Sequence, residues 1–136
     1  MTNIGASTSG APTGGVLTLL RAEGAALFAG ATLFYQVSDA PWSLYALLFL
    51  VPDLSFLAYL HGPRAGAFAY NIVHATVGPL MLALLSLVLV KPVLGTVSLI
   101  WLAHIGLDRA LGYGLKYDAG FALTHLGRIG KEPAKD

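Results

Sequence analysis

Four long apolar segments constrain the fold of this chain more than any other feature. Each has about the 20 residues that a helix needs to cross the hydrocarbon core of a bilayer. The segments cover about residues 16–37, 42–60, 66–90 and 94–115. Backbone groups in lipid must hydrogen-bond within their own segment, so helices are expected. The short Gly- and Pro-containing breaks between them force neighbouring helices to run antiparallel. The sequence therefore predicts an all-α fold, an integral membrane up-down-up-down four-helix bundle.

The composition supports a protein embedded in lipid. Charged residues make up only 11% of the chain and apolar residues 56%, whereas a soluble domain is about a quarter charged. A formal net charge of +1 gives no electrostatic case for binding nucleic acid. The absence of cysteine excludes disulfides, thiolate metal sites and cysteine nucleophiles. The expected partner is the lipid bilayer, and the sequence leaves a monomer or a homodimer open.

The two ends of the chain differ from the apolar segments. Residues 1–15 are small and polar with no apolar period, which predicts a disordered N-terminal tail before a transmembrane domain at 16–115. Residues 116–136 form a predicted cytoplasmic C-terminal tail. Apolar residues alternate there with basic ones, as in Leu126 and Arg128. This pattern is expected either of a short amphipathic segment on the inner leaflet or of a solvated basic tail.

The distribution of Lys and Arg predicts the orientation. With the N-terminus inside, nearly all basic residues fall on the inner side. The outer side has one basic residue, Lys91, and the acidic Asp39. We therefore expect a multi-pass protein of the bacterial inner (cytoplasmic) membrane with both termini cytoplasmic. In the first segment, Ala22, Ala26 and Gly30 recur every four positions. Such a stripe predicts close helix packing, either within the chain or at a homodimer seam.

Several polar and ionisable residues interrupt the apolar segments. A charged side chain near the centre of a spanning helix costs about 2.5–3.5 kcal/mol on insertion scales, so each one needs a reason. The residues concerned are Glu23, Asp53, Asn71, His74, His104, Asp108 and Arg109.

The depths and faces of these residues agree. In the predicted topology five of them lie roughly 10–17 Å from the inner helix ends, at about 1.5 Å per residue. These five are Glu23, Asp53, His74, His104 and Asp108. Asn71 shares a helix face with His74, and His104 shares one with Asp108. Pro52 is expected to kink the second helix beside a cavity, and Pro79 to be a tolerated kink in the third. The sequence predicts one polar pocket in the inner half of the bundle.

Four roles fit such a pocket. Imidazole and carboxylate ligands suit a divalent metal such as zinc or manganese, which could activate water for hydrolysis of a lipid-like substrate. Glu23, Asp53 and Asp108 are candidates for the general base, and the same three carboxylates with His74 and His104 are candidate ligands. Haem binding between the two histidines, proton conduction, and a purely structural hydrogen-bond network remain open at this point.

Three runs in the chain carry a family resemblance. They are LFLVPDLSFLAYLHGPRAGAFAYNIVH at 48–74, IWLAHIGLDRALGYGLKY at 100–117 and THLGRIG at 124–130. Over about residues 17–130 the chain resembles the small bacterial membrane-protein family catalogued as domain of unknown function 4260. The resemblance implies an integral membrane protein with four helices and implies no activity. The residues that carry the pattern include Asn71, Arg109, Arg64 and His125, to which the resemblance gives no role. We expect these four to be supporting polar residues.

Overall fold

The computed structural model describes residues 11–130. It contains four helical spans that are long and apolar enough to cross a membrane, so the all-α membrane fold is confirmed. The spans are Gly14–Val37, Trp42–His61, Pro63–Leu89 and Pro92–Leu111. The N-terminal tail predicted at 1–15 lies mostly outside the described residues. The up-down-up-down order of a regular bundle stays a prediction.

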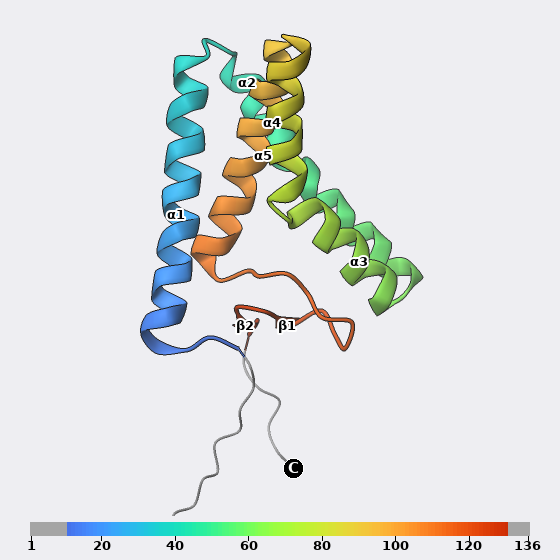
Figure 1. Ribbon diagram of the computed structural model, residues 1–136. Helices are drawn as coiled ribbons and strands as arrows, with labels where there is room; N and C mark the ends of the chain where they lie inside the picture. The colour runs from blue at the N-terminus through green and yellow to red at the C-terminus, as the bar shows by residue number, and fades with distance from the viewer. Residues whose placement is uncertain (1–10, 131–136) are drawn as a thin grey trace, which may run out of the picture.

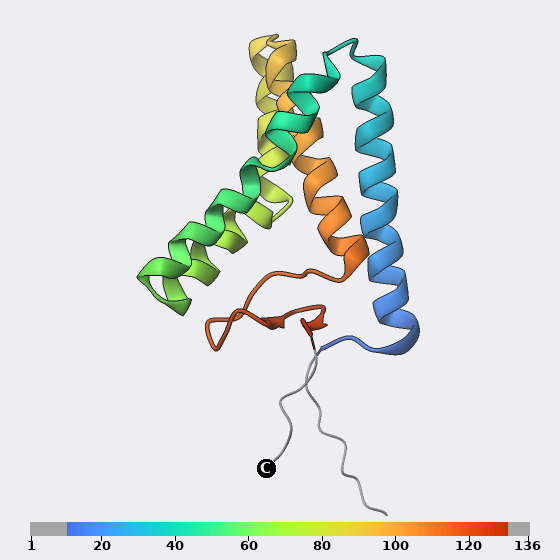
Figure 2. The same cartoon turned by 180° about the vertical axis from the view of Figure 1, so that it is seen from behind.

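Two of the four spans are interrupted, so the structure has six helices within the described residues. These are α1 (Gly14–Val37), α2 (Trp42–Phe49), the 3₁₀ helix η1 (Val51–His61), α3 (Pro63–His74), α4 (Val77–Leu89) and α5 (Pro92–Leu111). Helix α5 packs against both α1 and α4, and η1 packs against α3. Figures 1 and 2 show the paired η1 and α3 leaning away from α1 and α5.

Prolines account for both interruptions. A proline ring clashes with the carbonyl group four residues earlier and removes a backbone donor. Pro52 follows the junction of α2 and η1. Pro79 stands in the first turn of α4, and the residue four positions before it, Ala75, has left the helical conformation (φ −82°, ψ 139°). The expected kink at Pro79 is therefore a full break of the helix, placed directly after His74.

Side chains from α5 satisfy the carbonyl groups that the second break exposes. The last carbonyl groups of a helix have no partner within it. Trp101 Nε1 donates to the carbonyl of Val73 at 2.6 Å, and Arg109 Nη2 donates to the carbonyl of His74 at 3.1 Å. A cation at a helix C-terminus is also favoured by the helix dipole. These two hydrogen bonds from α5 therefore stabilise the break between α3 and α4.

Helices α1 and α5 approach closely because each presents a glycine to the backbone of the other, Gly24 to Arg109 and Ala110, and Gly106 to Phe28. A Cβ atom on Gly106 would lie 2.5 Å from the backbone nitrogen of Phe28 and 2.8 Å from the carbonyl oxygen of Gly24. Backbone atoms cannot swing aside as a flexible side chain can. The contact therefore depends on glycine at this position.

Gly106→Ala is expected to destabilise the protein by about 1–3 kcal/mol, the usual range for overpacking. Thermal unfolding of the purified protein in detergent measures the effect. Gly30→Ala is the matched control, because a Cβ atom on Gly30 would meet nothing within 4 Å. Equal melting temperatures for the two variants would contradict this packing.

The stripe of small residues predicted on the first helix does not make this contact. Ala22 and Ala26 are exposed, whereas Gly24 and Ala31 are buried on the face towards α5. The prediction of packing within the chain through the stripe is wrong. Spacing by four identified a row of small residues but not which side of the helix faces its neighbour.

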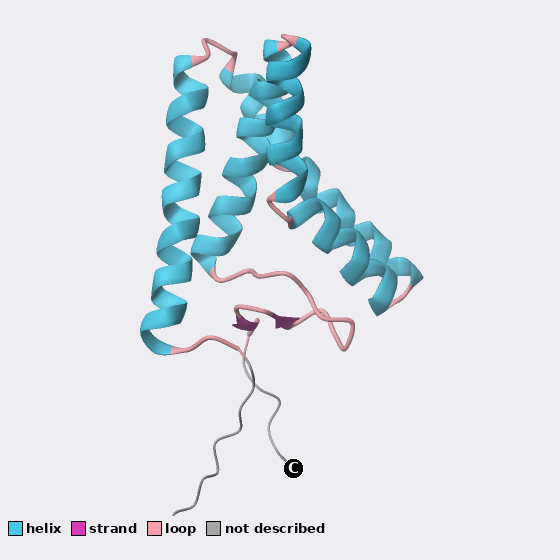
Figure 3. Ribbon diagram, viewed as in Figure 1, coloured by secondary structure: helices cyan, strands magenta, loops and turns pink. Residues whose placement is uncertain are grey.

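The C-terminal segment folds back under the helices, as Figure 3 shows. Gly112, in the left-handed conformation (φ 90°), ends α5, and Tyr113 N donates to the Asp108 carbonyl at 2.8 Å. Two short antiparallel strands follow, β1 (Leu123–Thr124) and β2 (Gly127–Arg128). Neither an amphipathic surface segment nor a solvated tail describes this hairpin. Residues 116–130 are therefore folded and not a free tail, whereas their cytoplasmic or interfacial location stays a prediction.

Candidate metal centre

Four ionisable side chains meet where the two interrupted spans cross α5. Asp53 lies in the first turn of η1, directly after the first break, and His74 is the last residue of α3. His104 and Asp108 are one turn apart on α5. One possible ligand atom from each of the four lies within 4.8 Å of all the others. Broken helices inside a membrane protein commonly line a cavity or a binding site.

The spacing of these atoms resembles that of ligands around one small metal ion. His74 Nε2 and His104 Nε2 are 3.2 Å apart, and Asp108 Oδ2 lies 3.4 Å and 3.3 Å from them. Asp53 Oδ1 lies 3.7 Å from His74 Nε2 and 3.3 Å from His104 Nε2. A tetrahedral ion with bonds of about 2.0–2.2 Å needs ligand atoms about 3.3–3.6 Å apart. Three of the five distances fall in this range, and the other two, 3.2 Å and 3.7 Å, lie just outside it. The two carboxylate oxygens lie within 4.8 Å of each other, so the cluster is wider on its carboxylate side than a tetrahedral ligand set.

The same distances do not suit a haem. Two axial nitrogens on opposite sides of one iron would be about 4 Å apart, twice a metal–nitrogen bond of about 2 Å. The two histidine nitrogens are only 3.2 Å apart. The macrocycle would also need the space that Asp53 and Asp108 occupy.

The environment of His74 fixes which nitrogen faces the cluster. Its Nδ1 lies 2.9 Å from the carbonyl oxygen of Tyr70, so Nδ1–H donates and the lone pair of Nε2 points at the other three residues. Metal-binding histidines commonly make this kind of hydrogen bond. The Tyr70 ring stacks on the imidazole at 3.7 Å between centroids. Nδ1 of His104 is buried and has no hydrogen-bond partner among the described residues.

Burial distinguishes the two histidines from the two carboxylates. His74 and His104 are each 2% exposed. The Asp53 side chain is 42% exposed and that of Asp108 19%. Both carboxylates line a cavity of about 330 Å³. The remaining residues around this cavity are Phe56, Tyr70, Tyr113, Lys116, Phe121 and Ile129. The cluster therefore has a buried imidazole side and an accessible carboxylate side.

The C-terminal segment closes one side of the cavity, and Asn71 holds it there. Asn71 Nδ2 donates to the Lys116 carbonyl at 2.8 Å, and Lys116 N donates to Asn71 Oδ1 at 2.7 Å. Burial lowers the pKa of Lys116, an effect that the nearby Asp108 carboxylate partly opposes. The supporting role predicted for Asn71 is thus to position the C-terminal segment.

Arg109 and His125 form a second link between the segment and the site. His125 Nδ1 accepts a hydrogen bond from Leu115 N at 2.8 Å, and Arg109 Nη1 lies 3.4 Å from both ring nitrogens. Burial lowers the pKa of His125, and the Arg109 charge lowers it further. Arg109 also donates a hydrogen bond to the carbonyl of His74. It therefore connects His125 in the C-terminal segment with the candidate ligand His74.

The structure brings together four of the five residues predicted to converge and leaves out Glu23. Glu23 is exposed on α1, next to Gly24, which faces α5. One residue along a helix is a rotation of about 100°, so Glu23 points away from the pocket, and its predicted place there is wrong.

Arg64 is exposed at the start of α3 and lines a different cavity, with Asn71 and Asp118. Sequence reasoning missed Tyr70, although its position four residues before His74 placed it on the same face.

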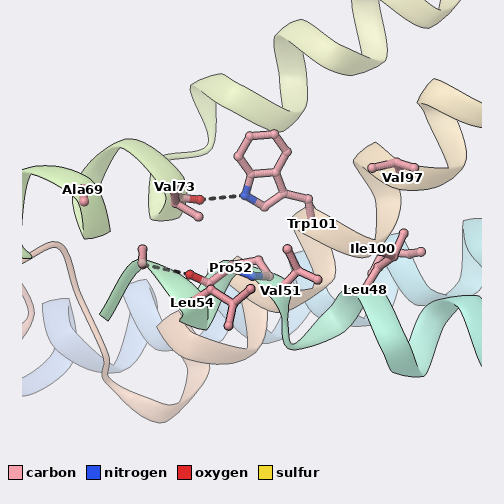
Figure 4. A pocket seen from close by; sticks show the side chains of 10 residues that line it. Leu48, Val51, Pro52, Leu54, Ala69, Val73, Val97, Ile100 and Trp101 are labelled. Carbon is pink, nitrogen blue, oxygen red and sulfur yellow. Dashed lines mark hydrogen bonds between the residues drawn. The ribbon is translucent and has the colours of Figure 1, made fainter. Parts of the chain in front are cut away.

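An apolar groove lies on another side of the same breaks. Its volume is about 530 Å³, and Figure 4 shows Trp101 beside Val73 in its lining. Pro52 and Val73 line the groove, and they immediately precede the candidate ligands Asp53 and His74 in the chain. The groove and the ligand cluster are therefore built on the same two stretches of backbone.

Comparison with known proteins bears out the resemblance drawn from the sequence. A family model described as a domain of unknown function (DUF4260) matches residues 17–129, which is most of the chain. No curated protein and no solved structure matches.

Proposed function

We propose a function from the geometry of the site, since the chain belongs to the DUF4260 family and the description of that family names no activity. The proposed function is that of a metal-dependent membrane hydrolase that acts on a lipid-like substrate. The observation that carries it is the cluster of Asp53, His74, His104 and Asp108, in which one possible ligand atom from each residue lies within 4.8 Å of all the others. Two imidazoles and two carboxylates suit Zn²⁺ or Mn²⁺.

We assign His74, His104 and Asp108 as ligands and Asp53 as the general base. Catalytic zinc sites usually keep three protein ligands and one open position. Asp53 Oδ1 makes the longest of the five distances in the cluster, 3.7 Å to His74. It is also the more exposed of the two carboxylates. A base must reach both the water and the substrate, and the more exposed Asp53 is better placed for this than Asp108, which lies in the last turn of α5.

The proposed reaction is hydrolysis. His74, His104 and Asp108 would hold the divalent ion, which would lower the pKa of a water in the site, and Asp53 would accept the proton that this water loses. The water oxygen forms a bond to the electrophilic carbon or phosphorus of the substrate, and the bond to the leaving oxygen breaks. Asp53 then delivers its proton to the leaving oxygen. One water is consumed, and an acid and an alcohol are released.

The apolar groove supports a lipid-like substrate. The groove lies in the membrane-spanning part of the fold and is lined by apolar groups from η1, α3 and α5. In a bilayer an acyl chain is the occupant of matching chemistry. We infer that the groove holds one acyl chain while the polar end of the lipid reaches the metal centre. We also infer that both chain ends are cytoplasmic and that the site opens in the inner half of a bacterial inner membrane.

Ala69→Phe is expected to narrow the groove, since Ala69 lines it. For a long-chain substrate kcat/KM should fall by roughly tenfold or more, because a displaced substrate loses its reactive alignment. A short-chain substrate should be hydrolysed as before. Ala29→Phe adds the same ring to the exposed side of α1 and serves as the control. Equal losses for both chain lengths would rule out the groove as the acyl site.

Hydrolysis assays in mixed micelles test the proposed function. The zinc- or manganese-loaded protein is incubated with lipid carboxylic esters and phosphate esters, beside a His74→Ala/His104→Ala double variant. Turnover that requires the metal and both histidines is expected. A protein that binds metal stoichiometrically and hydrolyses none of these substrates would contradict a hydrolase.

A further inference from the structure

Lys116 places a buried positive charge in the wall of the cavity beside the candidate metal centre. The residue is 4% exposed, and it lines the cavity with Asp53 and Asp108. Its Nζ lies 3.8 Å from the ring centre of Phe121 and 4.8 Å from that of Tyr70. Aromatic faces stabilise a cation at such distances. The ammonium group is therefore held in a fixed place.

The Lys116 ammonium group has N–H donors that its one hydrogen bond within the described residues does not use. Nζ donates one hydrogen bond, to the Phe121 carbonyl at 2.9 Å. A lysine ammonium carries three N–H donors. Within residues 11–130 Nζ makes no ion pair. Two donors thus remain for a ligand in the cavity.

Charge in the cavity changes when a metal binds. Without metal, the carboxylates of Asp53 and Asp108 face the same cavity as Lys116 and offset its charge. A divalent ion neutralises the two carboxylates and leaves the lysine uncompensated. A buried ammonium without a counter-charge is costly. The metal-bound site therefore favours an anion that contacts both the ion and Lys116.

We propose that this cavity binds a phosphate group between the metal ion and Lys116, and that the substrate of the enzyme is a phosphate ester. The identification as substrate rests on the proposed function, whereas phosphate binding needs only the metal site. A phosphate group has enough oxygens to contact the ion and both free Lys116 donors at once. The cavity, at about 330 Å³, is at the lower end of small-molecule sites and suits a head group better than a whole lipid. Water then breaks the phosphorus–oxygen ester bond, giving phosphate and an alcohol, and Asp53 returns the proton to the leaving oxygen.

Equilibrium dialysis of radiolabelled inorganic phosphate against the full chain in detergent tests the proposal, with elemental analysis of every sample. The zinc-loaded protein is expected to bind one phosphate per chain, and the metal-free protein at least tenfold more weakly. Lys116→Met should weaken binding at least tenfold at unchanged zinc content, and Lys116→Arg should retain most of it. Lys91→Met, at the exposed turn before α5, is the matched control and should bind as the parent does.

Two results would overturn the proposal. One is equal phosphate affinity of the zinc-loaded Lys116→Met and parent proteins. The other is equal affinity with and without zinc, which would contradict the argument from charge. A parent protein that retains no zinc is a separate result, because it contradicts the metal centre itself. Repeating the measurement with glycerol phosphate and with nanodiscs containing phosphatidic acid distinguishes a soluble phosphate from a lipid head group, the tighter ligand identifying the source.

Discussion

Asp53→Asn is expected to lower kcat by about 10²–10⁴-fold, the usual contribution of a positioned general base. Asparagine keeps the size of the side chain but cannot accept the proton of the attacking water. The metal should remain, because His74, His104 and Asp108 stay in place. Steady-state hydrolysis with the best substrate, together with metal content per chain, measures both effects.

Asp39→Asn is the control for this experiment. Asp39 is exposed in the turn between α1 and α2, and asparagine tolerates its left-handed conformation (φ 55°) well. A fully active Asp53→Asn protein would exclude Asp53 as the base. Loss of metal together with activity would instead make Asp53 a fourth ligand.

Removing the metal is expected to lower the thermal stability of the protein. A ligand that binds only the folded state stabilises it by about 2.7 kcal/mol at 100 times its dissociation constant. In this fold the ion would join His74 at the end of α3 to His104 and Asp108 on α5, across the second break. Melting temperatures are compared with chelator and with increasing zinc or manganese.

The His74→Ala/His104→Ala double variant is the control for the melting experiment, since its melting temperature should not respond to either metal. A parent protein whose melting temperature is unchanged by chelator and by added metal would argue against an ion at this site. A structural network would give that result, because its stability comes from contacts within the chain.

The four spans could be predicted from the sequence because lipid imposes a simple requirement on length and polarity. The convergence of Asp53, His74, His104 and Asp108 could be predicted almost as well. Their depths follow from counting residues to the helix ends, and helical period places His104 and Asp108 on one face. Glu23 shared the depth but not the face, and depth alone cannot determine the rotation of α1 about its axis.

The helix breaks and the C-terminal hairpin were harder to foresee. Pro52 and Pro79 marked the places where a helix bends, but whether a proline kinks a helix or ends it depends on what satisfies the freed carbonyl groups. At the second break, Trp101 and Arg109 supply those partners from α5. The position of Lys116 depends on Asn71, which is 45 residues away in the chain. No local period in the sequence reports such a contact.

Elemental analysis of the detergent-purified protein, run beside the His74→Ala/His104→Ala double variant, tests the metal centre most directly. The four ligand atoms, all within 4.8 Å of one another, predict close to one zinc or manganese ion per chain in the parent protein and none in the variant. Absence of metal from both samples, after attempted reloading with either ion, would contradict the metal centre and with it the proposed hydrolase.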